Sequence, residues 1–482
     1  MDAKKSVSGD NRVLFLDKIG YGVGNFGFGV VSQLISSYLV FYSTAILNIP
    51  GGLIGIAISI SVVWDSISDP LMGYISDKTN IKGLGRRHLY IIIGTIATAV
   101  FNILLWMIDP SLSTNIKFFW ILVDILILKS FMTVYATPYT ALGAELSNDY
   151  DERTSIQSIK MSFFMLGIAF ATAVSMVLFF RPTESFPIGQ LNPEAYKNMA
   201  IVSSILMVFF GLVCFYSTKK YIKVLPKSNK NDKSENALKS LFNALKNEDY
   251  RVVVIGYLFT NISSAILGSV GLHVFTYTFL MGNYKIAIIL GIQLGMGIIS
   301  QPFWLWFSKK KDKKPAVILG LVLSIIASSY FVIMVFLKEI VRVNFTYLIP
   351  FALIGGFGTG GLFTLPLSMI ADTTDEEELN TGRRIEGVYY GGMTLGYKLS
   401  QAVAIFILGM ILDIVNFDSS LEIQSDFTAM VLGLILGIGC IISFLLAAMS
   451  YRKYSITKEK MKIIQEDIVI ARQQNLILEY DE

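Results

Sequence analysis

Residues 64–87 read WDSISDPLMGYISDKTNIKGLGRR, and this stretch is the most informative about the fold. Its first half belongs to an apolar run near 51–76, yet Asp65 and Asp69 lie deep inside that run. A charge at the middle of a bilayer costs at least about 2.5 to 3.5 kcal/mol, so it persists where it faces a cavity, a partner or an ion. The stretch therefore predicts a membrane-spanning helix whose acids point to transport.

Composition extends this prediction to the whole chain. Of 482 residues, 53% are hydrophobic and only 16% are charged, and the mean hydropathy is +0.59, which excludes a soluble globular protein. A run of about 20 apolar residues crosses roughly 30 Å of hydrocarbon. Twelve such runs occur, near 20–47, 51–76, 89–109, 116–145, 156–181, 197–217, 252–280, 284–307, 315–337, 344–370, 387–412 and 427–450. An all-α membrane protein with twelve transmembrane helices is expected.

Basic residues concentrate in alternate loops, as is typical of loops that face the cytoplasm. They are Lys78, Lys82, Arg86 and Arg87 after the second run, Lys309 to Lys311, Lys313 and Lys314 after the eighth, and Arg383 and Arg384 after the tenth. Both termini are then cytoplasmic, and the plasma (cell inner) membrane is the expected location. The predicted parts are a cytoplasmic N-terminal tail (1–19), a six-helix bundle (20–217), a cytoplasmic linker (218–251), a second six-helix bundle (252–450) and a cytoplasmic amphipathic tail (451–482).

The polar segments argue against several other classes of function. Cys214 and Cys440 both lie inside predicted helices, so neither a disulfide scaffold nor a metal site is indicated. The net charge of +4 follows from the basic loops and does not imply nucleic-acid binding. No nucleophile triad or phosphate loop is found, so neither an enzyme nor a cofactor is expected. A monomer in the lipid bilayer is expected, and a channel or a non-transporting sensor stays open as an alternative.

The two halves of the chain repeat each other weakly. The second run and the eighth, which ends GIISQPFWLWFSKKKDKKP, both have a proline, Pro70 or Pro302, before a serine and a basic cluster. In the fourth and tenth runs, Pro138 and Pro366 both precede acidic clusters. Parallel repeats of six helices are typical of the major facilitator superfamily architecture. The stretch GYISDK at 73–78, followed by GRR, resembles the loop motif of that superfamily.

The repeat also isolates the acids of the second run as functional. Aligned through the prolines, Gly297 stands opposite Asp65 and Gln301 opposite Asp69, so the fold itself does not need the acids. At positions i and i+4 the two carboxylates share a helix face, and in a low dielectric one of them would take a proton unless a cation neutralises them. Oxygen ligands suit a hard cation, and Ser68 could add a hydroxyl. The alternative is that both acids only pair with basic residues of other helices.

Three stretches resemble the glycoside-pentoside-hexuronide:cation symporter family (melibiose permease-like). They are KIGYGVGNFG at 18–27, VVWDSISDPLMGYISDKT at 62–79, and MIADTTDEEEL through RRIEGVYYGGMTLGYK at 369–398. The resemblance runs from Lys18 to about Phe417. It implies a secondary active transporter of the major facilitator superfamily, which couples symport of a sugar, glycoside or related small solute to Na+ or H+ by alternating access.

The resemblance also assigns roles to individual residues. It places the cation site at Asp65, Asp69 and Thr133. Ser68 stands where the family commonly has asparagine, so the choice between Na+ and H+ stays open. The lysine that couples cation and substrate sites corresponds to Lys398, and Lys160 takes the place of an arginine near the sugar. No other metal is implied.

The substrate pocket departs from the family pattern. The two carboxylates that hold galactosides would fall at Gly29 and Ala136, and the expected tryptophan at Thr140, although an aromatic survives as Phe363. Other polar residues that could hold a glycoside, pentoside or uronide are Asn25, Gln33, Tyr139 and Gln401. The alternative is a more apolar cavity that takes a lysophospholipid or another amphiphile, as some relatives of the family do.

Two further sets of charges have expected roles. The set expected to form ion pairs that close a cytoplasmic gate is Asp77, Arg86, Arg87, Glu145, Arg153, Asp372 and Arg384. Asp124 and Lys129 of the fourth run are five residues apart and so do not share a helix face, and the lysine stem can reach toward the interface. A structural role is expected for both.

Overall fold

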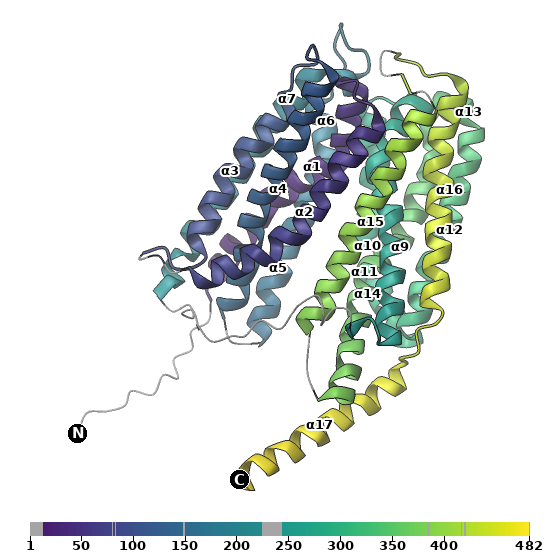
Figure 1. The fold of residues 1–482 in the computed structure, drawn as a ribbon. Helices are drawn as coiled ribbons and strands as arrows, with labels where there is room; N and C mark the ends of the chain where they lie inside the picture. The colour runs from purple at the N-terminus through teal and green to yellow at the C-terminus, as the bar shows by residue number, and fades with distance from the viewer. Residues whose placement is uncertain are drawn as a thin grey trace. The chain divides into compact units, whose positions relative to one another are not determined.

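The computed structural model describes residues 13–79, 81, 83–147, 150–223, 243–382, 386–415, 417–418 and 421–481. Regular secondary structure in these residues is helical apart from one isolated β-bridge between Ile81 and Gly85. Among the described residues, eleven helices are long and apolar enough to cross a membrane, and a bent pair of helices brings the spans to twelve when it is taken as one (Figure 1). The predicted all-α membrane fold is thereby confirmed.

The helices fall into two compact units. The first unit comprises the described residues of 1–35, 63–175 and 193–232, and the second comprises those of 36–62, 176–192 and 233–482. The first half of the chain contains α1 (Phe15–Phe41), α2 (Gly51–Lys78), α3 (His88–Trp106), α4 (Thr114–Glu145), α5 (Tyr150–Ala169), α6 (Ser175–Phe179) and α7 (Pro193–Thr218). The π-helical turns η1 (Tyr42–Ile46) and η2 (Phe170–Val174) extend α1 and α5, and the short 3-10 helices η3 (Gly189–Leu191) and η4 (Lys219–Lys223) flank α7.

The described residues of the second half of the chain also form helices. Its helices are α9 (Glu248–His273), α10 (Asn283–Ile299), α11 (Gln301–Lys311), α12 (Lys313–Phe336), α13 (Lys338–Val343), α14 (Ile349–Thr381), α15 (Glu386–Ile414), α16 (Asp426–Tyr451) and α17 (Lys458–Asp481), with the short helices η5 (Val274–Thr278) and η6 (Phe345–Leu348). Residue 384 and most of the predicted linker lie outside the described residues. The division at 218–251 stays a prediction.

In the first unit, α3 packs against both α4 and α7. A Cβ atom on Gly94 would lie 2.6 Å from the Tyr135 amide nitrogen, so α3 and α4 approach almost backbone to backbone. On the side toward α7, the buried Asn102 amide donates to Ser203 at 3.0 Å and to Ser204 at 2.9 Å. Small residues and satisfied polar groups of this kind hold helices together where lipid supplies no hydrophobic driving force. This packing positions α4, which carries half of the candidate site.

In the second unit, the predicted single span near 284–307 is in fact two helices. α10 and α11 meet at Ser300 with a bend of 40°. Pro302 has no amide hydrogen for the Ile298 carbonyl four residues earlier, and the Ser300 hydroxyl donates to the neighbouring Gly297 carbonyl at 3.0 Å. Gly360 of α14 fits against this break, since a Cβ there would lie 2.7 Å from the same carbonyl.

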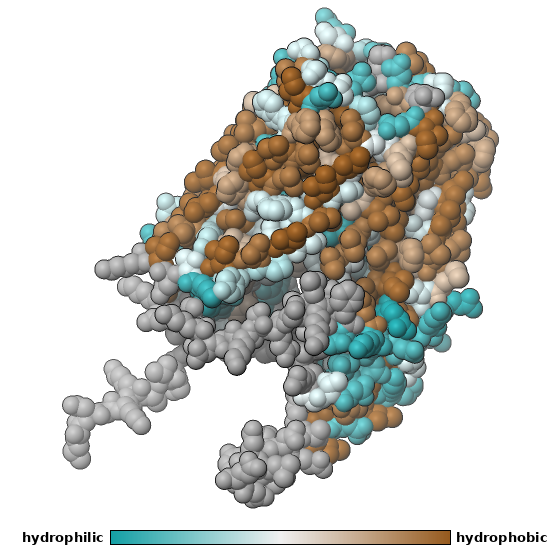
Figure 2. Space-filling view, in the orientation of Figure 1, coloured by the Kyte–Doolittle hydropathy of each residue, from teal (hydrophilic) through white to brown (hydrophobic). Residues whose placement is uncertain are grey.

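Large apolar side chains remain exposed along the outer faces of the spanning helices (Figure 2). On α3 they recur at Ile93, Ile96 and Val100, which share one face. An exposed apolar surface of this extent marks contact with a membrane. The tail helix α17 behaves differently, because Met461 and Ile464 are buried in the core cluster of the second unit. The first part of the predicted amphipathic tail therefore packs on protein.

Candidate cation and coupling site

The two acids of α2 lie one turn apart, and each meets a donor on α4. Thr133 donates its hydroxyl to Asp69 Oδ1 at 2.6 Å. Lys129 donates its ammonium to Asp65 Oδ2 at 3.1 Å. Donors four residues apart on α4 thus face acids four residues apart on α2, which requires both helices to present matched faces. The structure places Thr133 against Asp69 and Lys129 against Asp65, and the cation site itself stays a prediction.

Burial makes these contacts significant. Asp65 and Thr133 are both buried, with 6% and 5% of their surface exposed, and Asp69 is half-buried. Trp64 adds a further link between the helices, because its indole donates to the Ser130 hydroxyl at 2.7 Å. Ser68 directs its hydroxyl toward the Asp65 backbone carbonyl at 3.5 Å. Thr133 of α4 therefore supplies a hydroxyl to Asp69, whereas the Ser68 hydroxyl turns to the backbone.

The donor set limits what such a site can bind. Among the described residues, no group of three or more His, Cys, Asp or Glu could hold a metal ion. Two carboxylates and a hydroxyl, with an ammonium already beside one carboxylate, carry a net charge near −1. This charge suits one monovalent cation or one proton better than a divalent ion, which prefers more carboxylate ligands.

Three of the predicted substrate residues gather between α1, α4 and α5. Lys160 is buried, and its ammonium donates to the Thr140 hydroxyl at 3.0 Å and lies 5.5 Å from the Tyr139 ring centroid. Asn25 donates its amide to the Lys160 carbonyl at 3.2 Å. Tyr139 is buried, and its hydroxyl donates to the Tyr21 carbonyl at 2.9 Å. In this structure Tyr139 links α4 to α1.

The remaining predicted substrate residues divide between the units. Gln33 is half-buried on α1 in the first unit. In the second unit, Lys398 is half-buried on α15, and Gln401 donates its amide to the Tyr397 hydroxyl at 2.6 Å. Phe363 on α14 exposes 45% of its surface. Their roles stay predictions.

Four of the seven predicted gate charges form one cluster in the first unit. Arg87 is 4% exposed, and its guanidinium contacts Asp77 at 2.6 Å and Glu145 at 2.7 Å. Arg86 contacts the same Glu145 oxygen at 2.8 Å, and Arg87 also donates to the Ser76 hydroxyl at 2.6 Å. We call Ser76, Asp77, Arg86, Arg87 and Glu145 the arginine cluster. It ties the end of α2 to the start of α3 and the end of α4.

The other predicted gate charges lie elsewhere. Arg153 donates to the Ser147 carbonyl at 2.6 Å. Asp372 belongs to the second unit, where Lys313 contacts its carboxylate at 2.6 Å and the Tyr454 hydroxyl donates to it at 3.1 Å. Arg384 lies outside the described residues. The structure therefore associates Asp372 with α12 and the segment before α17.

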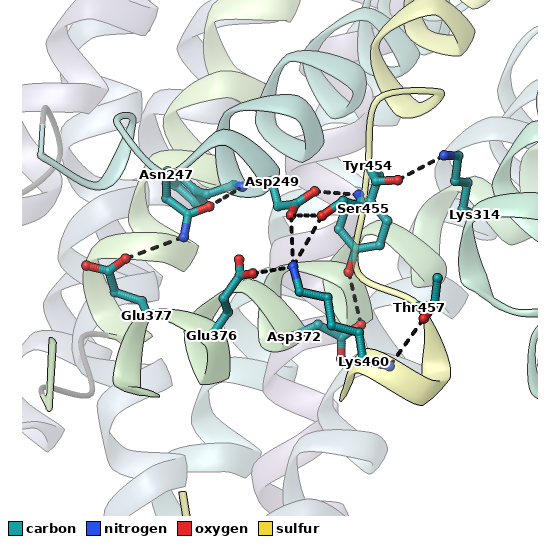
Figure 3. Close-up of polar contacts among 11 residues, drawn as sticks. Asn247, Asp249, Lys314, Asp372, Glu376, Glu377, Tyr454, Ser455, Thr457 and Lys460 are labelled. Atoms are coloured by element: carbon teal, nitrogen blue, oxygen red, sulfur yellow. Dashed lines mark hydrogen bonds and ion pairs between the residues drawn. The ribbon is translucent and has the colours of Figure 1, made fainter. Parts of the chain in front are cut away.

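A polar network anchors the segment that leads into α17 (Figure 3). The Asp249 carboxylate accepts from both the amide and the hydroxyl of Ser455 at 2.6 Å. Lys460 contacts Glu376 at 2.7 Å, and Lys314 donates to the Tyr454 carbonyl at 2.9 Å. Burial and the adjoining Asp372 carboxylate raise the pKa of Tyr454, so its phenol stays a donor at neutral pH. The sequence interpretation missed this network.

Tyr454→Phe is expected to loosen this anchor. Removing a hydrogen bond to a buried charged group costs about 1.5 to 3 kcal/mol, so the variant should melt earlier and a protease should cut its tail faster. Tyr330→Phe is the matched control, because that hydroxyl donates to an exposed backbone carbonyl at 2.8 Å. Equal tail cleavage in wild type and Tyr454→Phe would contradict the anchoring role.

The residue of the candidate cation site that the sequence interpretation missed is Lys129. In the sequence, Lys129 was considered together with Asp124, which lies five residues before it, and not with Asp65. The position of Thr133 could have indicated Lys129, because residues four positions apart on a helix share one face. A basic residue on the face expected to meet the acids was therefore a candidate partner.

These features define a class of protein. Helices that cross a membrane and buried acids paired between helices are typical of a membrane transporter and not of an enzyme. The fold agrees, because the structure matches that of a D-xylose-proton symporter with a TM-score of 0.63 at 14% identity, over 92% of this chain and 98% of that chain.

Comparison with known proteins identifies the family. The family model described as MFS/sugar transport protein matches residues 20–458, so the chain belongs to that family. The inner membrane symporter YicJ of Escherichia coli (strain K12) is 24% identical over 94% of this chain and 94% of its own length. The sodium-dependent lysophosphatidylcholine symporter 1 of Xenopus tropicalis is 24% identical over 98% of this chain and 93% of its own length. The predicted membership of a glycoside/cation symporter family is confirmed.

Proposed function

We propose that this membrane transporter couples the movement of a small solute to that of a cation, Na+ or H+, bound between α2 and α4. The observation that carries the proposal is the buried Asp65 beside Asp69, with the Thr133 hydroxyl 2.6 Å from the second carboxylate. Intramembrane acids are costly unless they serve an ion or a partner. The relatives described as symporters support the same coupling.

A sugar, glycoside or related polar solute is the proposed substrate class. The family description includes sugar transport, and Asn25, Lys160 and Thr140 form a polar cluster of the first unit. Lys398 is proposed to link cation and substrate binding, so that each ligand changes the affinity for the other. The arginine cluster is proposed to break and re-form during alternating access.

A lysophospholipid is the second candidate substrate. A relative named for sodium-dependent lysophosphatidylcholine symport aligns over 98% of this chain. Gly29 and Ala136 stand where carboxylates that grip galactosides are expected, so the polar grip of those carriers is absent. An apolar pocket with few placed polar groups suits an amphiphile. We further propose that the protein is a monomer of the plasma membrane with both termini cytoplasmic.

Charge movement on solid-supported membranes that carry the purified protein separates these candidates. Glycosides, pentoses, uronides and lysophosphatidylcholine are applied in turn, with and without Na+ and at two pH values. A cation-dependent current evoked by a sugar supports the first candidate, and a response to lysophosphatidylcholine alone supports the second. A current evoked by solute that ignores both Na+ and pH would contradict coupled symport.

A further inference from the structure

The Lys129 ammonium lies where a bound cation would neutralise Asp65. Its nitrogen is 3.1 Å from Asp65 Oδ2, and the side chains of Lys129 and Asp65 expose only 24% and 9% of their surface. Lys129 lies within the apolar span of α4, far from the basic loops. Such a position is costly for an ammonium unless a carboxylate holds it.

Charge balance sets Lys129 against any external cation. Asp65 and Asp69 together carry two negative charges, and Lys129 already neutralises one of them. A cation that bridges both carboxylates would lie within a few Å of the ammonium. Two like charges that close in a low dielectric repel strongly. Either the ammonium leaves Asp65, or the external cation binds more weakly than it would if the ammonium were absent.

We propose that Lys129 is a tethered cation that occupies the Asp65 side of the site when no external cation is bound, and that an external cation must displace it. The proposal rests on the cation site proposed above. It makes Lys129 a specificity residue, since it sets the affinity for the external ion. When the ammonium is displaced from Asp65, the long and flexible lysine side chain lets it turn toward the membrane interface.

If the Asp65–Lys129 ion pair only held α2 and α4 together, replacing Lys129 would not raise the affinity for the external cation. A second bond also links these helices, between Trp64, which precedes Asp65, and Ser130, which follows Lys129. This hydrogen bond carries no net charge. Ser130→Ala therefore removes an inter-helix bond of the same region without changing the charge of the site. It is the matched control for Lys129.

The test is Na+ binding by purified protein in nanodiscs, measured by isothermal titration without solute for wild type, Lys129→Met, Lys129→Arg, Ser130→Ala and Asp69→Asn. Lys129→Met is expected to bind Na+ at least about tenfold more tightly than wild type, because a competing charge is gone. Lys129→Arg is expected to bind it more weakly, because a guanidinium stays charged and can grip a carboxylate with two bonds. Ser130→Ala should match wild type.

The other outcomes separate this inference from the proposed function. Equal Na+ affinity in wild type, Lys129→Met and Lys129→Arg, with binding lost in Asp69→Asn, would overturn the tethered cation and leave the site intact. No Na+ binding in any variant, Lys129→Met included, would overturn the tethered cation as a competitor of Na+, and the pH arm of the charge-movement experiment would then decide whether the proposed site serves H+. If Lys129→Met does not fold, Lys129→Arg alone decides, since wild-type affinity there contradicts competition.

Discussion

Asp69→Asn is expected to abolish cation-stimulated solute uptake while leaving the protein folded. The amide keeps the shape of the side chain and can still bond to Thr133, but it carries no negative charge for the ion. Removing one partner of a buried charge pair costs about 2 kcal/mol or more, so cation affinity should fall at least about thirtyfold. Uptake into proteoliposomes with and without a Na+ or pH gradient measures the loss.

The control for this variant is a second neutralised acid. Asp109 lies in an exposed loop, where the Ser111 amide donates to its carboxylate at 2.9 Å. Asp109→Asn removes the same charge in the loop that precedes α4, away from Lys129 and Thr133 along the chain, and should transport as wild type does. Undiminished cation stimulation in Asp69→Asn would mean that the carboxylate is not an ion ligand.

Arg87→Ala is expected to lower the thermal stability of the protein and its transport activity. Arg87 is buried and contacts Asp77, Glu145 and Ser76 at once, so its loss removes three links between helices and leaves Glu145 with Arg86 as its cation. Removing a hydrogen bond between charged groups costs about 1.5 to 3 kcal/mol. Thermal unfolding in nanodiscs, followed beside initial uptake rates, measures both effects.

Two variants bracket this result. Arg87→Lys retains the charge but has no planar fork to reach both acids, so it should fall between wild type and alanine. Arg181→Ala removes an exposed arginine that donates to the Val177 carbonyl at 3.3 Å, and it should unfold at the wild-type temperature. A wild-type melting temperature for Arg87→Ala would show that the arginine cluster does not hold α2, α3 and α4 together.

Much of the fold could be predicted because hydropathy dictates membrane spans. Apolar length alone placed the twelve spans, with ends close to those of α3 and α16. Hydropathy could not show the break at Ser300, which depends on how Gly360 of α14 packs against Gly297. Nor could it show that Met461 packs in the core, because an amphipathic pattern fits protein and lipid surfaces equally.

The candidate site was predictable only in part, and for a geometric reason. Helical spacing placed Asp65 and Asp69 on one face, and a family resemblance supplied Thr133. The pairing of Lys129 with Asp65 depends on the rotation and depth of α4 relative to α2, which spacing within one helix does not contain. The same holds for Tyr139, whose hydroxyl bonds to the α1 backbone.

The most direct test of the central claim is a cation jump without solute. Membranes that carry wild-type protein are adsorbed to a solid support, and a step in Na+ concentration or in pH is applied beside membranes with Asp69→Asn. The proposed site predicts a transient charge movement in wild type for at least one of the two steps, and its loss in the variant. Identical responses in the two proteins would contradict a cation site at Asp65 and Asp69.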